Sequence, residues 1–263
     1  MTAIIDLDSV AYAAGNGVKL LGPDGLPIRE DGKRFVYRDK TKQELIESVD
    51  SVMENILKTS EATHYIGYIK GQRTTEKRLS INPDYKAQRS QIPPTWWWGV
   101  KSAFITQWGA IEANGYEVDD FVLATKNLLK DDSFIVAIDK DLLSLEGRHY
   151  NWRTQEWIDV SKVAASVKFW TDMIVGQPID NIKGIPGKGP KFTENLFTWA
   201  EVSMGVSVIT EYVRFFGEHK GIQEFYKNYM SLKLLAEIPG LVPQPIPVPE
   251  HIKQKEPKME DFL

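Results

Sequence analysis

Residues 134–141 read Phe-Ile-Val-Ala-Ile-Asp-Lys-Asp, an apolar run that ends directly in two acidic residues. An uninterrupted apolar run of this length, rich in β-branched residues, is typical of a strand buried on both faces. Asp139 and Asp141 then lie where the strand ends. In α/β proteins, ligands bind outside the carboxyl ends of parallel strands. This stretch therefore predicts both a buried strand and an acidic site at its end.

The chain on either side alternates between strand and helix patterns. Residues 3–7 and 64–69 predict two further strands, and between them the Thr41 and Glu44 capping box opens a helix over 42–58. A long loop or hairpin is expected at 15–40, a hairpin at 148–160, and helices at 96–112, 118–130, 161–175, 206–219 and 221–236. Alternating strands and helices predict an α/β fold, with a mostly parallel central sheet flanked by helices.

Composition limits the class of protein. The chain has 263 residues, of which 42% are hydrophobic and 26% charged, as in ordinary soluble domains. It has no cysteine, which excludes disulfides and thiolate metal sites. No apolar run approaches the roughly 18 residues that span a bilayer, and no signal peptide is recognisable, so we expect a cytoplasmic protein without a membrane partner. The net charge of −4 argues against coating nucleic acid through bulk charge.

Acidic residues recur at the predicted strand ends and helix starts. Each group alone has an ordinary explanation as a helix cap or a turn. If they converge, two carboxylates about 5 Å apart repel by about 3 kcal/mol at an effective dielectric of about 20, so cations must lie among them. Oxygen ligands without Cys or His favour Mg²⁺ or Mn²⁺. The groups are Asp6 and Asp8, Glu117, Asp119 and Asp120, Asp139 and Asp141, and Asp180.

A basic segment precedes three consecutive tryptophans. Residues 70–89 carry six basic and two acidic residues, a net charge of +4 (6 − 2) in a chain whose total is −4. Such a segment suits a phosphate backbone, with a solvated charged face as the alternative. The tryptophans at 96–98 cannot all face one side of a helix, so at least one is expected in the core, and a base-stacking role is the alternative.

Five sequence elements, in this order, resemble motifs of the 5′ nuclease superfamily, which includes flap endonucleases and 5′–3′ exonucleases, and the phage members most of all. The resemblance spans about residues 3–200. The elements are Ile4-Ile-Asp6 with Ser9 and Tyr12, Asn82-Pro-Asp-Tyr-Lys-Ala-Gln-Arg89, Glu117-Val-Asp-Asp120, Ala137-Ile-Asp-Lys-Asp141 and Asp180-Asn-Ile-Lys-Gly-Ile-Pro-Gly-Lys-Gly189.

The resemblance implies a PIN-like fold with a helical arch and a helix–three-turn–helix element that grips DNA. It divides the chain into a nuclease domain at 1–175, a helical region at 176–236 and a proline-rich flexible tail at 237–263. It also implies two divalent metal ions, Mg²⁺ or Mn²⁺, which lower the pKa of the attacking water. A monovalent cation such as K⁺ at the glycine-rich turn is a further implied ligand.

The resemblance assigns roles to individual residues. Asp6, Glu117, Asp119 and Asp120 would hold the first metal and Asp139, Asp141 and Asp180 the second. Lys86 and Arg89 would neutralise the scissile phosphate, from one face if their segment is helical. DNA-binding roles fall to Lys70, Arg73, Lys77 and Arg78 in the arch, and to Lys183, Gly184, Gly187, Lys188, Gly189 and Lys191 at the glycine-rich turn.

The chain departs from the family pattern at two positions. No Asp lies between Thr63 and Asn82, where the family has one at the end of its second strand. Gln177 stands where the family has a metal-binding Asp, and the pattern does not require Asp8, which we expect to compensate in part. The departures concern binding of the second metal ion, and a weakened or inactive enzyme is therefore an alternative to an active one.

The tail from Glu237 is rich in proline and cannot continue a helix, so we expect it to be extended or disordered. Its last residues, 258–263, resemble the C-terminal peptides with which replication proteins dock on sliding clamps, so a clamp is an expected partner, with disorder in the absence of a partner as the alternative.

Three functions follow from these patterns. The first is a monomeric metal-dependent nuclease that acts on DNA with a 5′ end or flap, or on an RNA/DNA hybrid, as exonuclease, flap endonuclease or primer-removing enzyme. The second is a DNA-binding replication accessory that has lost a metal. The third, an RNA-cutting toxin of the PIN fold, is disfavoured because such domains are shorter and lack the glycine-rich element.

Overall fold

The computed structural model describes residues 1–89, 92–198 and 203–253. The strands are β1 (Thr2–Asp6), β2 (Val18–Lys19), β3 (Arg29–Glu30), β4 (Arg34–Phe35), β5 (Tyr37–Arg38), β6 (His64–Lys70), β7 (Ile111–Ala113), β8 (Ser133–Val136), β9 (Gly147–Asn151), β10 (Glu156–Val160), β11 (Gly176–Gln177), β12 (Ile182–Lys183) and β13 (Ile246–Pro247). The helices are α1 (Leu7–Gly15), α2 (Lys42–Thr59), α3 (Glu76–Leu79), α4 (Trp97–Trp108), α5 (Val118–Leu129), α6 (Lys162–Val175), α7 (Pro190–Thr198), α8 (Met204–Phe216), α9 (Glu218–Leu232) and α10 (Glu250–Lys253), with 3₁₀ turns η1 (Lys130–Asp132), η2 (Lys140–Ser144) and η3 (Pro178–Asp180).

The main sheet is mixed but mostly parallel, as predicted. Its strands lie in the order β10-β9-β8-β1-β6-β13, and β7 also pairs with β6. β1 is central and runs parallel to both β6 and β8, with Ile4 opposite Ile66 and Ile135. β10 and β13 are antiparallel to their neighbours. The carboxyl ends of β1, β6 and β8 therefore meet at one edge.

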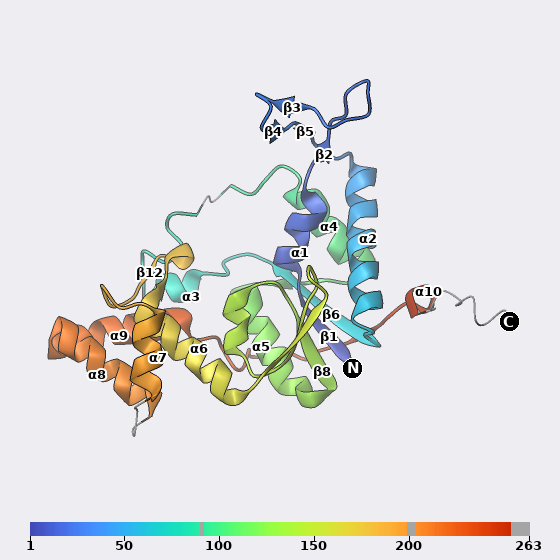
Figure 1. The fold of residues 1–263 in the computed structure, drawn as a ribbon. Helices are drawn as coiled ribbons and strands as arrows, with labels where there is room; N and C mark the ends of the chain where they lie inside the picture. The colour runs from blue at the N-terminus through green and yellow to red at the C-terminus, as the bar shows by residue number, and fades with distance from the viewer. Residues whose placement is uncertain (90–91, 199–202, 254–263) are drawn as a thin grey trace.

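Helices cover both faces of this sheet (Figure 1). Ala3 and Ile5 of β1 pack with α1, α2 and α4 on one face, whereas Ile4 packs with α5 on the other. This alternation follows from the two-residue period of a strand. Because both faces are covered, the central strands are apolar throughout except at their ends, where Asp6 follows Ile5.

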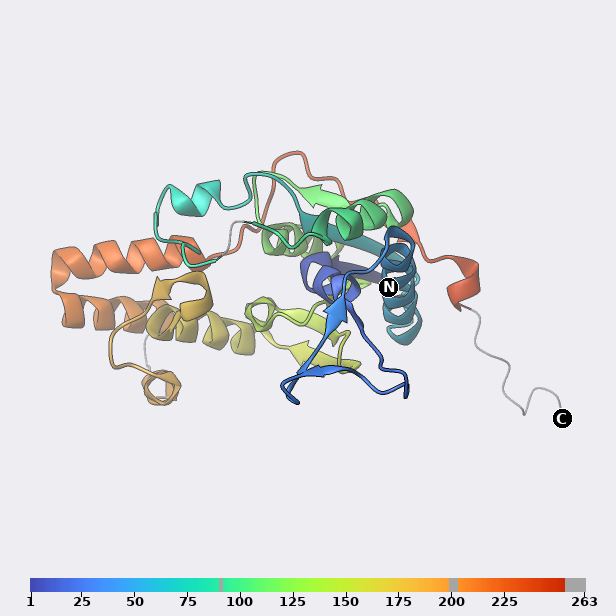
Figure 2. The same cartoon turned by 90° about the horizontal axis from the view of Figure 1, so that it is seen from above.

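A helical lobe lies to one side of the sheet, as both views show (Figures 1 and 2). Its core joins Met173 and Ile174 of α6 to Val208 and Tyr212 of α8, and residues of α7 and α9 pack around them. α6 and α7 flank the glycine-rich turn, and the helix–three-turn–helix element that grips DNA stays a prediction. The expected helical arch stays a prediction, because in the described part of 71–96 the only helix is the one-turn α3.

The structure differs from the predicted elements at two places. The helix expected over 96–112 ends at Trp108, because Gly109 adopts a left-handed conformation (φ 61°) and the chain continues as β7. The tail from Glu237, expected to be extended or disordered, is mostly extended, but it packs on the fold as far as residue 253. Its β13 pairs with β6, and Val248 and Ile252 are buried against the core.

Candidate active site

Two neighbouring strands end in the same local arrangement of two acidic residues. After β1, the Asp6 carboxylate caps α1 and accepts a hydrogen bond from the backbone N–H of Asp8 at 3.0 Å. After β8, the Asp139 carboxylate caps η2 and accepts from the backbone N–H of Asp141 at 2.8 Å. Because β1 and β8 are parallel neighbours, both pairs lie at the same edge of the sheet. The strand-end acids predicted from the sequence therefore occupy one site.

Asp119, in the first turn of α5, joins this group. Burial raises its pKa well above the usual value, and the charges of Asp6 and Asp139 raise it further. Burial, with Asp8 and Asp139 nearby, likewise raises the pKa of Asp6 to about 7. A shift of this kind means that the ionised carboxylates destabilise one another. The charge distribution therefore favours a cation at this place.

Asp8 lies at the end of β6, although it follows β1 in the sequence. Its Oδ1 accepts a hydrogen bond from the backbone N–H of Lys70 at 2.8 Å. Burial raises the pKa of Asp8 to about 6, while Lys70, Lys86 and Lys101 lower it. The strand end that lacks its own Asp thus has the carboxylate of Asp8 beside it.

A second group of side chains surrounds Glu117 and Asp180. The Tyr85 hydroxyl donates to Glu117 at 2.8 Å or to Asp180 at 3.0 Å. The Lys86 ammonium contacts Glu117 and lies 3.4 Å from Asp180 Oδ2, and Arg89 pairs with Asp180. Lys86 and Arg89, which were predicted to act on the phosphate, are therefore at the carboxylate cluster.

The segment that carries Lys86 and Arg89 is a series of turns, so the conditional prediction of a helix does not hold. Lys86 has a positive φ of 55°. Its backbone N–H donates to the carbonyl of Asp180 at 3.0 Å, and the Asn181 side chain donates to the carbonyl of Asp84 at 2.7 Å. These bonds join two segments about ninety residues apart, so tertiary contacts fix the positions of both cations.

A third group, which the sequence analysis did not find, lies on α6. The Asp172 carboxylate pairs with Lys168 and accepts a hydrogen bond from the Gln177 amide at 3.1 Å. Lys168 also lies 3.4 Å from Asp141. Asp172 lines the same small cleft as Glu117, Asp119, Asp141 and Asp180. An Asp on an otherwise ordinary helix gives no sequence signal, because its orientation depends on how α6 packs.

Asp120, for which the resemblance implied metal binding, is paired with Arg78 in this structure. Its side chain is fully buried and accepts four hydrogen bonds, two from the Arg78 guanidinium at 2.8 and 2.9 Å and one each from the backbone N–H of Glu117 and Leu235. A carboxylate offers about four acceptor positions, so these bonds use all of them. Asp120 is a structural residue in this arrangement.

Arg78, for which the resemblance implied a contact with DNA, is buried at 5% exposure in this structure. Besides Asp120, it pairs with Glu117 at 2.8 Å and donates to the carbonyl of Ser231 at 3.0 Å. The basic residue type was recognised in the sequence, but its burial was not, since buried arginines and exposed ones look alike in a basic segment.

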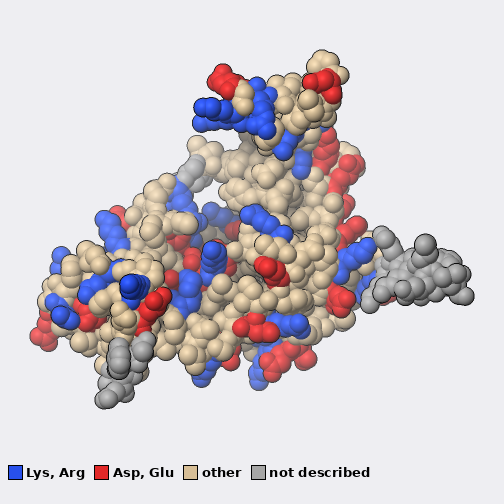
Figure 3. Space-filling view, in the orientation of Figure 1, with Lys and Arg blue, Asp and Glu red and all other residues tan. Residues whose placement is uncertain are grey.

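The other predicted DNA-binding cations differ in their surroundings. Lys70, Arg73, Lys77, Lys183 and Lys191 are exposed. Lys77 lies over the ring of Tyr116, and Lys188 lies over the ring of Phe192. Figure 3 shows lysines and arginines gathered on the N-terminal hairpins β2–β5 and on the helical lobe, with acidic side chains among basic ones between them.

The glycines of the turn have two different roles. A Cβ at Gly184 would lie 2.2 Å from the carbonyl oxygen of Ile174, so this glycine allows close packing against the end of α6. Gly187 has φ 76°, and neither it nor Gly189 has a neighbour within 4 Å of an added Cβ. Only Gly187 and Gly189 therefore leave open space for a ligand.

The three tryptophans separate as their spacing predicted. Trp97 is buried in the core, Trp96 packs against Gly15 and Tyr12, and Trp98 is 64% exposed. The expectation that at least one lies in the core is confirmed by Trp97.

The donor chemistry of the cleft fits hard divalent cations. Among residues 1–89, 92–198 and 203–253, no three His, Cys, Asp or Glu side chains converge closely enough to hold a metal ion. However, two ammonium groups lie between carboxylates, Lys86 between Glu117 and Asp180, and Lys168 between Asp141 and Asp172. These lysines mark two places where the surrounding oxygens attract a positive charge.

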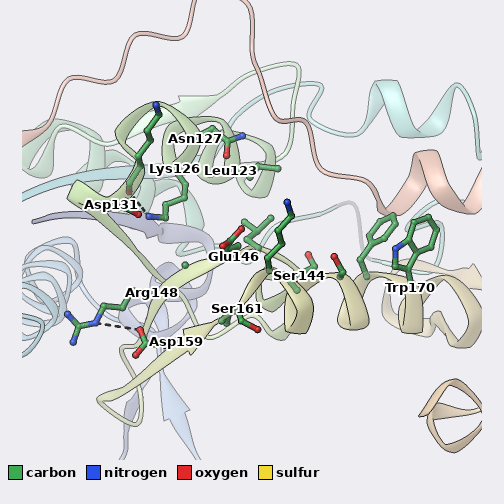
Figure 4. A pocket seen from close by; sticks show the side chains of 18 residues that line it. Leu123, Lys126, Asn127, Asp131, Ser144, Glu146, Arg148, Asp159, Ser161 and Trp170 are labelled. Carbon is green, nitrogen blue, oxygen red and sulfur yellow. Dashed lines mark hydrogen bonds and ion pairs between the residues drawn. The ribbon is translucent and has the colours of Figure 1, made fainter. Parts of the chain in front are cut away.

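A larger hollow of about 970 Å³ lies outside this cleft, between the end of α5, the β9–β10 hairpin and α6 (Figure 4). Lys126, Glu146, Arg148 and Asp159 line it, and Arg148 pairs with Asp159 at 3.9 Å. Acidic and basic side chains alternate here, so the hollow lacks the concentration of one charge that distinguishes the carboxylate cleft.

Solved structures of known proteins share this fold. The T5 D15 protein co-crystallised with metal ions superposes with a TM-score of 0.64 at 15% identity, covering 88% of this chain and 89% of that one. The bacteriophage T5 D15 flap endonuclease in complex with DNA and metal ions gives 0.61 at 14% identity, with 88% and 89% covered. At such identity these matches establish the fold.

One curated relative also matches in sequence. It is a 5′-3′ exonuclease of Mycoplasmopsis pulmonis (strain UAB CTIP), 28% identical over 45% of this chain. The match spans 46% of the relative, which is less than half its length. No protein-family model matches the chain. Together the comparisons show a resemblance in sequence to a 5′-3′ exonuclease and a resemblance in fold to the T5 proteins. Within the described residues, no helix is long and apolar enough to cross a bilayer.

Proposed function

We propose that the protein is a divalent-metal-dependent 5′ nuclease that hydrolyses phosphodiester bonds near 5′ ends or flaps of DNA. The observation that carries the proposal is that two groups of side chains adjoin at Asp119. Asp6 and Asp139 lie on one side of it, and Glu117 with Lys86 on the other. Asp6 ends β1, Asp139 follows β8, Asp119 lies in the first turn of α5 and Asp180 ends η3. Such convergence is not needed for capping or for stability, since it raises the pKa of Asp6 and Asp119.

Asp6, Asp119 and Asp139 would hold one cation, and Glu117, Asp141 and Asp180 a second. Mg²⁺ or Mn²⁺ bound there would lower the pKa of water and neutralise charge on the phosphate. Lys86 and Arg89 would exchange their carboxylate partners for phosphate oxygens and stabilise the charge that develops there. The same proposal includes cleavage as an exonuclease, as a flap endonuclease or as an RNA-primer-removing enzyme. It also includes a role in replication and the binding of K⁺ at residues 184–189.

The test is cleavage of a 5′-flapped duplex, labelled in turn at the end of each strand, in Mg²⁺, Mn²⁺ or EDTA. We expect cleavage near the flap junction or 5′ end that needs the divalent ion and is lost in Asp119→Asn and Lys86→Ala. Lys162→Ala is the matched control, because Lys162 is exposed at the start of α6 beside the other hollow. Loss of activity in the control, or cleavage in EDTA, would contradict the proposal.

A DNA-binding accessory protein of the same fold is the second candidate. It is favoured by Gln177 at a position where the family has a carboxylate, and by the fact that no three acidic side chains converge closely in the described residues. An accessory would bind the flapped duplex equally well in EDTA and would not cut it in either ion. Docking on a sliding clamp through 258–263 concerns residues outside those that the structure describes.

A further inference from the structure

We propose that Asp172 is a metal ligand of this cleft and takes the place of the carboxylate that position 177 lacks. The inference rests on the proposed nuclease function and adds a residue that no motif contains. Asp172 belongs to α6, five residues before Gln177, and its side chain is 15% exposed. It therefore reaches the cleft from the helix and not from the turn that follows.

The contact between Asp172 and Gln177 places the two side chains at one point. The Gln177 amide nitrogen donates to Asp172 Oδ2 at 3.1 Å. An amide at 177 can orient a carboxylate but has no charge to attract a cation, whereas Asp172 beside it supplies that charge. Compared with a carboxylate at position 177, the negative charge is displaced by about one hydrogen-bond length to Asp172, and the Gln177 amide orients the Asp172 carboxylate.

Lys168 shows that a positive charge is accommodated here. It lies one helical turn before Asp172, pairs with it, and also approaches Asp141 Oδ1 at 3.4 Å. One ammonium therefore lies between carboxylates from two elements, η2 and α6. A divalent cation at this place carries twice the charge, and the long Lys168 side chain, 28% exposed, can turn to solvent as the ion binds.

The surroundings of Asp172 belong to the proposed site and not to a separate surface. Glu117, Asp119, Asp141 and Asp180 line the same cleft. Asp172 differs from a surface acid such as Asp159, which is 85% exposed and lies on the edge strand β10. Asp159 therefore offers a matched control of equal charge.

The experiment measures Mn²⁺ binding to the full chain by calorimetry and by the electron paramagnetic resonance spectrum of free Mn²⁺. We expect Asp172→Asn to weaken one binding event by about tenfold or more, the scale on which metal sites respond to lost carboxylate support. Asp172→Asn combined with Gln177→Asp should restore it, because the carboxylate returns to position 177. Lys168→Met should tighten it, because the competing ammonium is removed, and Asp159→Asn should bind as the wild type does.

The outcomes separate this inference from the proposed function. If the wild type binds Mn²⁺ and cuts the flapped duplex, while Asp172→Asn binds Mn²⁺ unchanged, the role of Asp172 is overturned and the nuclease stands. If weak binding in Asp172→Asn is not restored by Gln177→Asp, although the circular dichroism and melting temperature of the double variant match the wild type, the replacement of position 177 is overturned. A wild type that neither binds Mn²⁺ nor cuts overturns both.

Discussion

Lys86 combines a left-handed backbone with an ammonium group held between two carboxylates. A positive φ is uncommon for a residue with a Cβ and is kept only where surrounding contacts impose it. Here the contacts are the N–H bond to Asp180 and the ion pairs with Glu117 and Asp180. The strained position holds the ammonium between the carboxylates of Glu117 and Asp180.

We expect Lys86→Ala to reduce the cleavage rate by about 10²–10³-fold, the usual effect of removing one group that stabilises charge in a transition state. Binding of the duplex should change little, because other cations contribute to it. Single-turnover kinetics separates the two effects. Lys86→Arg, which keeps the charge, should retain more activity than Lys86→Ala, and equal rates for the two variants would contradict the role.

The raised pKa values of Asp6 and Asp8, about 7 and about 6, predict how stability depends on pH in EDTA. A carboxyl with a folded-state pKa above its unfolded value stabilises the fold while it is protonated, and this contribution is lost as pH rises through the folded pKa. Chemical denaturation should therefore show lower stability at pH 8 than at pH 5.

The control for this prediction is Asp8→Asn, which removes one of the titrating groups. Its stability should change less between pH 5 and pH 8 than that of the wild type. Saturating Mg²⁺ should also reduce the loss at pH 8, because a cation favours the ionised carboxylates. An identical pH profile for wild type and Asp8→Asn would show that these carboxylates do not control stability.

At the residue scale, the sequence predicted most of the acidic site but not its internal division. Asp6, Asp139 and Asp119 could be placed because strand ends and helix starts are local features. The sequence could not show that Asp119 and Asp120 have different surroundings. Only the folded position of Arg78 places a guanidinium against Asp120. Asp172 and Tyr85 were missed for a related reason, because their roles arise from contacts with distant segments.

At the scale of elements, Arg78 joins three parts of the chain. It extends from α3 to Asp120 at the start of α5 and to the carbonyl of Ser231 at the end of α9. The helix α3 has four residues and could not be stable alone. The buried ion pairs therefore determine where the basic segment lies relative to the sheet.

We expect Arg78→Met to lower the free energy of unfolding by about 3–5 kcal/mol, because Asp120 would be left buried without its partner. Arg89→Met is the matched control, since Arg89 is 46% exposed and its loss should cost about 1 kcal/mol or less. Denaturant titration compares them. If the two variants lose equal stability, the buried network is not what holds these elements together.

Elements with local signals were predicted well, and those that depend on partners were not. The expected helix over 42–58 is α2, and the hairpin at 148–160 is β9 and β10. α4 was predicted too long because Gly109, a helix-ending signal, lay within an apolar stretch. β13 has two residues, one of them a proline, and gives no strand pattern, so only its pairing with the edge of β6 makes it a strand.

For the whole molecule, the helical lobe lies beside a sheet covered by helices (Figure 2). The cleft is lined by both parts, by Asp119 of α5 and by Asp172 of α6. The exposed cations of the glycine-rich turn, Lys183 and Lys191, belong to the lobe. Both side chains are exposed to solvent, so we expect them to hold the DNA backbone and not to take part in the reaction.

Replacing Lys183 and Lys191 together with Ala should weaken duplex binding and reduce the dependence of log affinity on log salt concentration by about 0.9 for each phosphate that the variant no longer neutralises. The single-turnover rate at saturating enzyme should stay near that of the wild type. Fluorescence anisotropy at several salt concentrations measures the slope. An unchanged slope would show that these lysines do not contact the backbone.

The segment that carries β13 and α10 should contribute to global stability. Ile252→Ala removes a side chain that is 5% exposed in the core, so we expect a loss of about 2–5 kcal/mol. Val242→Ala alters a residue 72% exposed in the same proline-rich segment and should stay within about 0.5 kcal/mol. The measurement is thermal and denaturant unfolding. Equal losses of stability in the two variants would show that this segment does not contribute to the stability of the fold.

β13 lies at the end of the strand order, and its second residue is Pro247. An uncovered strand edge presents N–H and carbonyl groups on which another molecule can add a strand, which is how many proteins begin to aggregate. Proline has no N–H to offer and is tolerated at such edges for this reason. The strand that completes this part of the sheet thus also protects it, so concentrated solutions should resist self-association through this edge.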